Sequence, residues 1–152
     1  MSNISDAFDA IKALMQTTLP GHNQLTNPYD IGENTTEQLL KGWGLAIGPG
    51  LNTQRQIGCD ISIQRTFSIP LTRARHGNSL ITSNKESNEK LLMEDHFLVV
   101  KAMEKDATVN DNLTITRCIF SGDGGIESVY ADEDHYITIV ASFELEYFED
   151  LT

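Results

Sequence analysis

Four consecutive polar residues near the C-terminal end, Asp132-Glu133-Asp134-His135, are the densest group of side chains able to ligate a metal. Carboxylates and imidazoles are common metal ligands. Consecutive residues of an extended segment point alternately to opposite faces, however, and the DxDxDG spacing of a calcium-binding loop is absent. We therefore predict an acidic turn here rather than a metal site.

A second group, Glu94-Asp95-His96, lies in a segment with helical periodicity. It lacks the HExxH spacing that places two histidines on one helix face around zinc, so a solvated helix face is predicted. The four histidines of the chain fall one to a segment, and no GxSxG turn presents a serine nucleophile. The residues therefore predict neither a catalytic site nor a cofactor.

The glycine-rich stretch Ser121-Gly122-Asp123-Gly124-Gly125 resembles phosphate-binding loops in composition, because glycines let backbone amides approach an anion. The GxxxxGK[ST] frame of such loops is missing, and the stretch falls between two predicted strands. It is predicted to be a hairpin turn.

Arg73, Arg75 and His76 stand in a locally basic stretch, residues 71–85, of a chain that is otherwise acidic. A cationic patch complements the acidic surfaces of other copies of the same chain. We predict an assembly interface from these residues together with Arg65, which interrupts the apolar side of a long strand. A plain solvated loop is the alternative. Charge reversal at Arg73 and Arg75 is then expected to weaken assembly and leave the fold intact.

The charge balance bears on possible partners. Twenty-two acidic and eleven basic residues give a net charge of −11, which repels phosphate backbones and anionic lipid. Sequence-specific nucleic-acid binding is therefore not expected, and any self-association should be helped by screening salt or divalent cations. The N-terminal residues lack the pattern of a signal peptide, and no apolar run has the length of a membrane span, so cytoplasmic synthesis is expected.

Apolar spacing predicts one two-layer α+β domain over residues 1–152, with a mixed or antiparallel sheet flanked by helices. It divides into an N-terminal helix over 1–20, an irregular segment over 21–56 and a sheet-plus-helix core over 57–152. The irregular segment is expected to include a helical turn at 36–41 and a short strand near Leu45. Cys59 and Cys118 lie in apolar stretches and are predicted to be buried thiols, a disulfide between them being the alternative.

Within the core, alternating apolar residues predict a long strand from Ile57 that ends at Pro70. A helix should begin near Glu86 and continue through Met103, with an apolar stripe that packs on the sheet. Three strands follow it, over residues 113–120, 126–130 and 137–147.

Five segments in this order resemble tail terminator, or tail-completion, proteins of long-tailed bacteriophages over residues 38–151. They are QIGCDISIQRTFSIPLTRA, KLLMEDHFLVVKAM, LTITRCIF, the GDGG turn and DHYITIVASFELEYFEDL. The resemblance implies a structural virion protein made in the host bacterial cytoplasm. Such a protein forms a hexameric ring that caps the tail tube, ends its polymerisation and joins the tail to the head-side connector.

The same resemblance gives the acidic composition a purpose, since DNA passes through such a ring and carboxylates in the lumen repel its phosphates. Candidates for the lumen or a subunit interface are Asp60, Asp132, Glu133 and Asp134. The partners implied are further copies of the chain, the tail tube protein and the connector, with no membrane. The closest alternative is a head-completion or connector protein of the neck, followed by a small acidic enzyme or ligand-binding domain.

Overall fold

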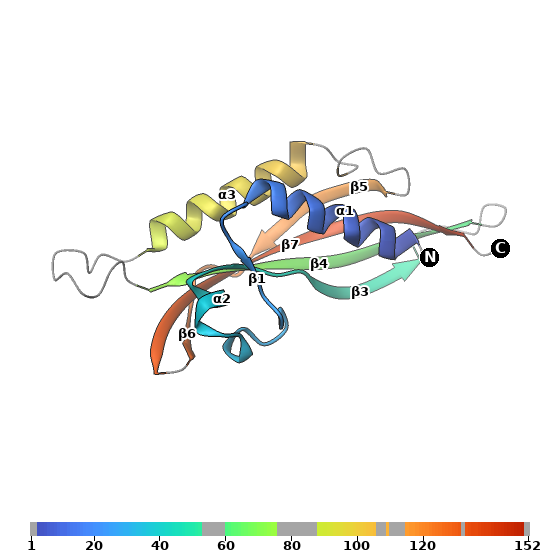
Figure 1. Cartoon of the computed structure of the whole chain (residues 1–152). Helices are drawn as coiled ribbons and strands as arrows, with labels where there is room; N and C mark the ends of the chain where they lie inside the picture. Colours follow the sequence, from blue (N-terminus) through green and yellow to red (C-terminus); the bar gives the residue numbers. More distant parts are fainter. Residues whose placement is uncertain are drawn as a thin grey trace.

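The computed structural model describes residues 3–52, 60–75, 88–105, 109, 115–131 and 133–150. They form a mixed seven-stranded sheet with three α-helices and one 3-10 turn, which confirms the predicted α+β class (Figure 1). The elements are α1 Asn3–Thr18, β1 Asn23–Gln24, η1 Ile31–Glu33, α2 Thr36–Leu40, β2 Lys41–Trp43, β3 Ala46–Asn52, β4 Asp60–Ala74, α3 Glu89–Lys105, β5 Ile115–Asp123, β6 Glu127–Ala131 and β7 Asp134–Asp150.

The centre of the sheet is the antiparallel pair of β4 and β7, in register from Asp60 opposite Asp150 to Ala74 opposite Tyr136. β2 and β3 lie along the other side of β4, and β5 and β6 lie along the other side of β7. β1 pairs with β2 in parallel, which makes the sheet mixed. The segment predicted to be irregular thus contributes three short strands to the sheet.

Pro70 does not end the long strand, contrary to the prediction, because β4 continues to Ala74. The carbonyl of Pro70 accepts a hydrogen bond from the amide of Gly44, on the side where the neighbour of β4 changes from β3 to β2. The N–H and C=O of a strand residue point to the same neighbouring strand. The N–H that Pro70 lacks would therefore point to the place where β3 ends as the neighbour of β4 and β2 begins. Proline is tolerated there because no regular ladder bond is lost.

The glycine-rich stretch is not a hairpin turn, because β5 and β6 do not pair with each other. Both strands pair antiparallel with β7, so they run in the same direction, one after the other, along one edge. The register shifts between Phe120 and Gly122, and φ is positive at Gly122 and Gly125. Glycine suits this bend because residues with a side chain rarely adopt a positive φ.

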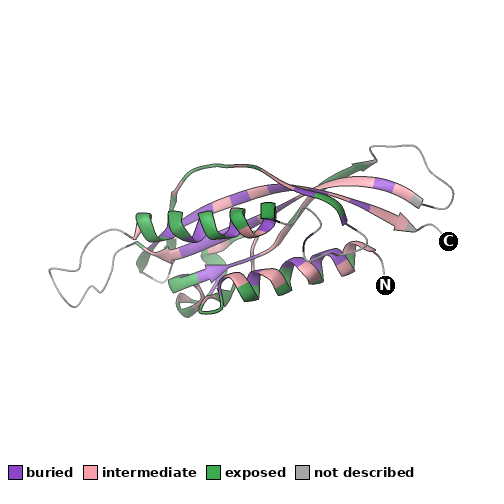
Figure 2. Ribbon diagram, turned by 90° about the horizontal axis from the view of Figure 1, so that it is seen from above, coloured by how far each residue is buried: buried purple, intermediate pink, exposed green. Residues whose placement is uncertain are grey.

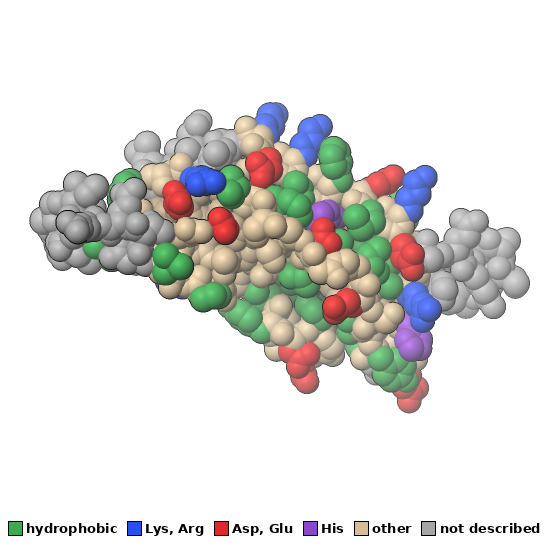
Figure 3. All heavy atoms as spheres, turned by 180° about the vertical axis from the view of Figure 1, so that it is seen from behind, with side chains coloured by type: hydrophobic (Ala, Val, Ile, Leu, Met, Phe, Trp, Pro, Cys, Tyr) green, Lys and Arg blue, Asp and Glu red, His purple; other side chains and the backbone are tan. Residues whose placement is uncertain are grey.

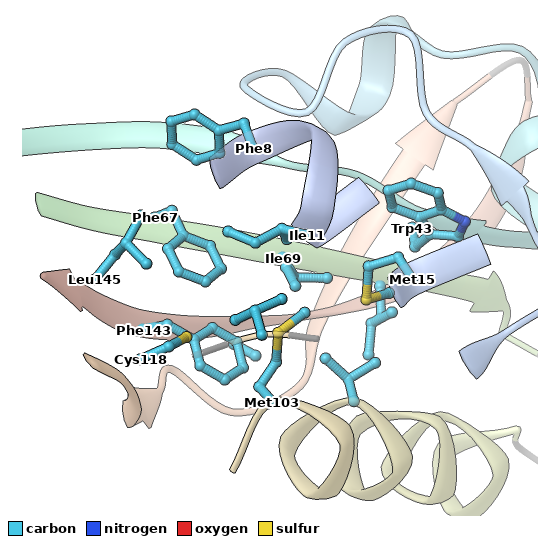
Figure 4. Close-up of a cluster of buried hydrophobic side chains, with 14 of the residues drawn as sticks. Phe8, Ile11, Met15, Trp43, Phe67, Ile69, Met103, Cys118, Phe143 and Leu145 are labelled. Carbon is cyan, nitrogen blue, oxygen red and sulfur yellow. The ribbon is translucent and has the colours of Figure 1, made fainter. Parts of the chain in front are cut away.

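α1 and α3 cover one face of the sheet, here called the inner face, as Figure 1 shows. The apolar side chains of β4 and β7 point to this face and meet the buried sides of both helices; seen from above, the opposite side of α3 is largely exposed (Figure 2). Phe67 and Phe143 stack across the two strands with ring centroids 5.1 Å apart. Phe8 of α1 and Phe120 of β5 meet this pair edge-on, and Figure 4 shows the surrounding cluster.

α2 covers one end of the opposite, outer face, and Ser62 near the other end is also buried. α2 begins with a capping box in which the Thr35 side chain and the Gln38 side chain each accept the other residue's backbone N–H. Leu39 of this helix packs with Tyr136 in a second, smaller hydrophobic cluster. The rest of the outer face carries polar, partly exposed side chains, which we call the polar stripe: Gln64, Thr66, Ser68, Ser142, Glu144 and Glu146.

Gly42 of β2 lies where α2, β4 and the segment after β1 meet. A Cβ atom at this position would lie 2.5 Å from Thr72 Oγ1 and 2.6 Å from the carbonyl oxygen of Gln38. We expect Gly42→Ala to lower the free energy of unfolding by about 1–3 kcal/mol through overpacking. Gly124→Ala is the matched control, because nothing lies within 4 Å of a Cβ there. Equal urea midpoints for the two variants would contradict this close approach.

Candidate functional site

A buried ion-pair cluster joins α3, β4 and the turn after α1. Arg73 of β4 donates from Nε to Asp95 Oδ2 at 2.7 Å and from its terminal Nη2 to Oδ1 at 3.1 Å. His22 Nε2 lies 3.2 Å from the same Oδ2 atom. The Asp95 side chain is only 7% exposed and that of Arg73 13%. The cluster therefore holds α3, β4 and the turn after α1 together at one end of the helix layer.

The ionisation of Asp95 reflects two opposed effects. Burial raises the pKa of this carboxyl group, whereas the hydrogen bonds from His22 and Arg73 and the charge of Arg73 lower it, and the net pKa lies below the ordinary value of 3.8. Asp95 is therefore ionised near neutral pH and paired with the guanidinium. Both carboxylate oxygens are engaged by side chains of the protein, which makes Asp95 a structural anchor.

The prediction of a solvated helix face at Glu94-Asp95-His96 is wrong for two of the three residues. Glu94 is exposed, but Asp95 and His96 are buried. His96 Nε2 lies 3.4 Å from Asp123 Oδ2, and its ring meets Phe120 edge-on at 5.5 Å. The signal was present in the periodicity, because both residues fall between Leu92 and Val99 on the apolar stripe of the helix.

The basic residues predicted to form an interface have different surroundings. Arg73 lies in β4 rather than in a loop, and its guanidinium is bound to Asp95. Arg65 donates to the Tyr147 hydroxyl at 3.3 Å and to the Gly48 carbonyl at 3.1 Å, so it too has partners inside the molecule. Arg75 is exposed at the end of β4. His76 lies outside the described residues.

This geometry overturns the expectation that Arg73 can be reversed in charge with the fold intact. A carboxylate at this position would face Asp95 and leave two like charges buried together. Arg75 is the one of the four interface candidates that the described structure leaves on the surface.

The acidic candidates do not gather at one place. Asp60 pairs with Asp150 at one end of the central ladder. Asp134 begins β7 at the other end, beside Glu133, whose positive φ of 64° lies in the turn between β6 and β7. Asp132 lies outside the described residues. No three His, Cys, Asp or Glu side chains in the described ranges form a group that fits a metal ion.

The prediction of buried thiols is confirmed at Cys118, which is a free, buried cysteine on the inner face. Burial, with a smaller contribution from the charge of Glu104, raises its pKa to about 12, so this thiol stays protonated and unreactive. Cys59 lies outside the described residues. Within the described part of the chain, no helix combines the length and apolar character needed to cross a membrane.

The exposed aromatic residues were not singled out as contact residues from sequence. Phe97 lies on the outer side of α3 and Tyr130 on β6, each 62% exposed. Although Phe97 is apolar, it does not belong to the packing stripe of α3, because its position is opposite the buried residues Leu92, Asp95 and Val99. The period of 3.6 residues carries this information, since Phe97 is about 140° from Leu92 around the helix.

Figure 3 shows how charged side chains are distributed on one side of the molecule. Lys and Arg side chains are spaced along the upper margin with acidic side chains among them, and cationic, histidine and acidic side chains lie together at the lower right corner. The exposed charges of α3 balance, since Glu89, Glu94 and Glu104 accompany the three lysines of the helix. No known family model matches the chain, and no curated protein was found to match it.

Proposed function

We propose that this chain is a structural virion protein that forms a ring capping a phage tail tube, ends tube polymerisation and joins the tail to the head-side connector. The observation that carries the proposal is the polar stripe on the outer face of the sheet. The stripe is a continuous surface of short polar and acidic side chains on the two longest strands. A ring whose lumen is lined by such a surface lets DNA pass without binding it.

The electrostatics of the stripe support this role. Glu144 and Glu146 are its charged members, and they stand on β7 opposite Thr66 and Gln64. Arg117 of β5 approaches Glu146 at 3.8 Å, so these two charges partly neutralise each other, and Glu144 carries the other negative charge of the stripe. The stripe therefore presents two partly exposed carboxylates, which repel phosphates at short range.

Ring formation is the direct test. Molar mass by light scattering across NaCl and MgCl2 concentrations, combined with negative-stain images, is expected to reveal closed rings of about six copies that become more abundant as the net charge of −11 is screened. A chain that stays monomeric at about 1 mM across all these conditions would contradict the proposal.

The stripe itself can be tested by reversing its charge. We expect Glu144→Lys with Glu146→Lys to bind a short DNA duplex at low salt at least about tenfold more tightly than the unaltered chain, and to lose this binding at about 200 mM salt. Fluorescence anisotropy measures the effect. Asp6→Lys with Asp9→Lys makes the same charge change on α1, away from the outer face. DNA binding that rises equally in both variants would assign the effect to net charge and remove this support.

A further inference from the structure

Arg65 is a partly buried cation that has no acidic partner among the described residues. Its Nε donates to the Tyr147 hydroxyl at 3.3 Å and its Nη1 donates to the Gly48 carbonyl at 3.1 Å, and both acceptors are neutral. Arg73 and Arg117, by contrast, each lie beside a carboxylate. A partly buried charge without a counter-charge is costly, so a bound carboxylate would lower the free energy of this part of the molecule.

The third nitrogen of the Arg65 guanidinium, Nη2, is available to a ligand. An arginine side chain carries more N–H donors than the bonds from Nε and Nη1 use, and Nη2 has no hydrogen-bond partner in the described part of the chain. The fully buried side-chain atoms that lack a partner there are Thr72 Oγ1 and His96 Nε2, and Nη2 is not among them. Nη2 therefore contacts solvent, and its N–H groups can donate to an incoming oxygen.

Glycine at position 50 leaves the space in which the guanidinium lies. Gly50 of β3 is directly opposite Arg65 of β4. A Cβ atom on Gly50 would lie 2.7 Å from Arg65 Cζ and 2.8 Å from Nη2, so the guanidinium packs over the glycine backbone where any side chain would overlap it. This packing and the two hydrogen bonds fix the orientation of the donors. A group that is already held in place loses little conformational entropy when it binds.

The surroundings of Arg65 allow a ligand to approach. β3 pairs with β4 and lies at an edge of the sheet (Figure 1). Ile47 of β3 is opposite Phe67, which makes it a diagonal neighbour of Arg65 on the inner face. The Ile47 side chain is 49% exposed, so this part of the inner face is open to solvent.

We propose that Arg65 is a binding site for a carboxylate group, which accepts hydrogen bonds from Nη2. A planar carboxylate suits the planar guanidinium, and a hydrogen bond between two ionised groups is stronger than one between neutral groups. A carboxylate is favoured over a phosphate because the net charge of −11 repels the more highly charged phosphate more strongly. A small carboxylic acid and an acidic side chain of a second copy present the same atoms. The site does not depend on the proposed ring.

NMR of the arginine Nε–H groups tests the site directly. Sodium acetate is added to the unaltered chain near neutral pH, with sodium chloride at equal ionic strength as the reference. The Arg65 signal should shift saturably with acetate, with a Kd of about 10–100 mM. Exposed Arg75 is the control within the same spectrum. An Arg65 shift no larger than that of Arg75, or saturation by inorganic phosphate at lower concentrations than acetate, would overturn the proposal.

Gly50→Ala tests whether the position of the guanidinium creates the site. This variant keeps the charge of Arg65 but places a methyl group where the guanidinium lies, so acetate binding should weaken at least about fivefold. Gly124→Ala is the matched control and should bind acetate like the unaltered chain, because nothing lies within 4 Å of a Cβ there. Circular dichroism checks that both variants fold. Unchanged acetate binding in a folded Gly50→Ala chain would mean that acetate binds elsewhere.

Dilution of the unaltered chain in chloride alone identifies the source of the carboxylate. An Arg65 signal that changes with chain concentration, and that acetate reverses, places the carboxylate on a second copy. A signal that responds to acetate but not to dilution assigns the site to a free carboxylic acid, and both results support the site. Rings that form equally well from the Arg65→Gln chain leave the proposed function standing, whereas acetate binding by a chain that never forms rings leaves the site standing.

Discussion

Replacing Asp95 with Asn is expected to lower the free energy of unfolding by about 3 kcal/mol or more, because breaking a buried ion pair leaves the remaining charge uncompensated. Arg73 would keep its positive charge at a site where its side chain is only 13% exposed, and His22 would lose its ionic partner. Urea denaturation at pH 7 measures the change. Glu94→Gln removes the same charge from the exposed neighbouring position and should alter stability by less than about 0.5 kcal/mol.

The same cluster predicts a direction of pH dependence. The folded-state pKa of Asp95 lies below its ordinary value of 3.8, so the folded state binds this proton less tightly than the unfolded state. The stabilisation is therefore fully present above about pH 4 and is lost as the pH falls through the folded-state pKa. Between pH 7 and pH 2.5, Asp95→Asn should lack this part of the acid sensitivity that Glu94→Gln retains. Parallel curves for the two variants would show that Asp95 is not the group involved.

Replacing Phe143 with Ala is expected to cost about 3–5 kcal/mol, a large share of the roughly 5–15 kcal/mol that holds a domain of this kind folded. Phe143 is fully buried, stacks on Phe67 at 5.1 Å and meets Phe120 edge-on at 5.6 Å. Its removal leaves a cavity in the core between the sheet and the helices. The melting temperature should fall by about 2–4 °C for each kcal/mol lost.

Phe97→Ala is the matched control for this experiment, since it removes the same side chain from an exposed position. It should leave the melting temperature almost unchanged. If Phe97→Ala destabilised the monomer as much as Phe143→Ala, α3 would pack through Phe97, and the surface assigned to it would be wrong.

The central strands were predictable because one polarity pattern determines their orientation over many residues. Apolar side chains from Phe67 to Leu71 and from Ile137 to Tyr147 alternate without interruption, and the structure buries them on one face of β4 and β7. The N-terminal helix, the helical turn before β2 and the strands after α3 are confirmed for the same reason, with boundaries shifted by a few residues.

The features that sequence did not predict depend on distant partners. The polarity of Arg73 and Asp95 suggests exposure, and only the crossing of α3 over β4 brings them together, 22 residues apart in the chain. Pro70 is tolerated because a neighbouring strand changes at its level, and the glycines near 122 bend one edge because β5 and β6 share β7 as partner. The exposure of Phe97 and Tyr130 likewise follows from how α3 and the β6–β7 hairpin pack.

The unbroken register of β4 and β7 has a mechanical consequence. All 15 residues of β4 are matched along β7, and antiparallel hydrogen bonds lie perpendicular to the strands. A pull applied along the strands at opposite ends of this ladder loads its hydrogen bonds together in shear, rather than opening them one after another. Near one of these ends, the backbone N–H of Asn3 in α1 donates a hydrogen bond to the Glu149 carboxylate, and the Asn3 side-chain amide donates one to the Phe148 carbonyl. If neighbouring molecules hold a copy at the two ends of its sheet, the β4–β7 ladder therefore carries the tension between them.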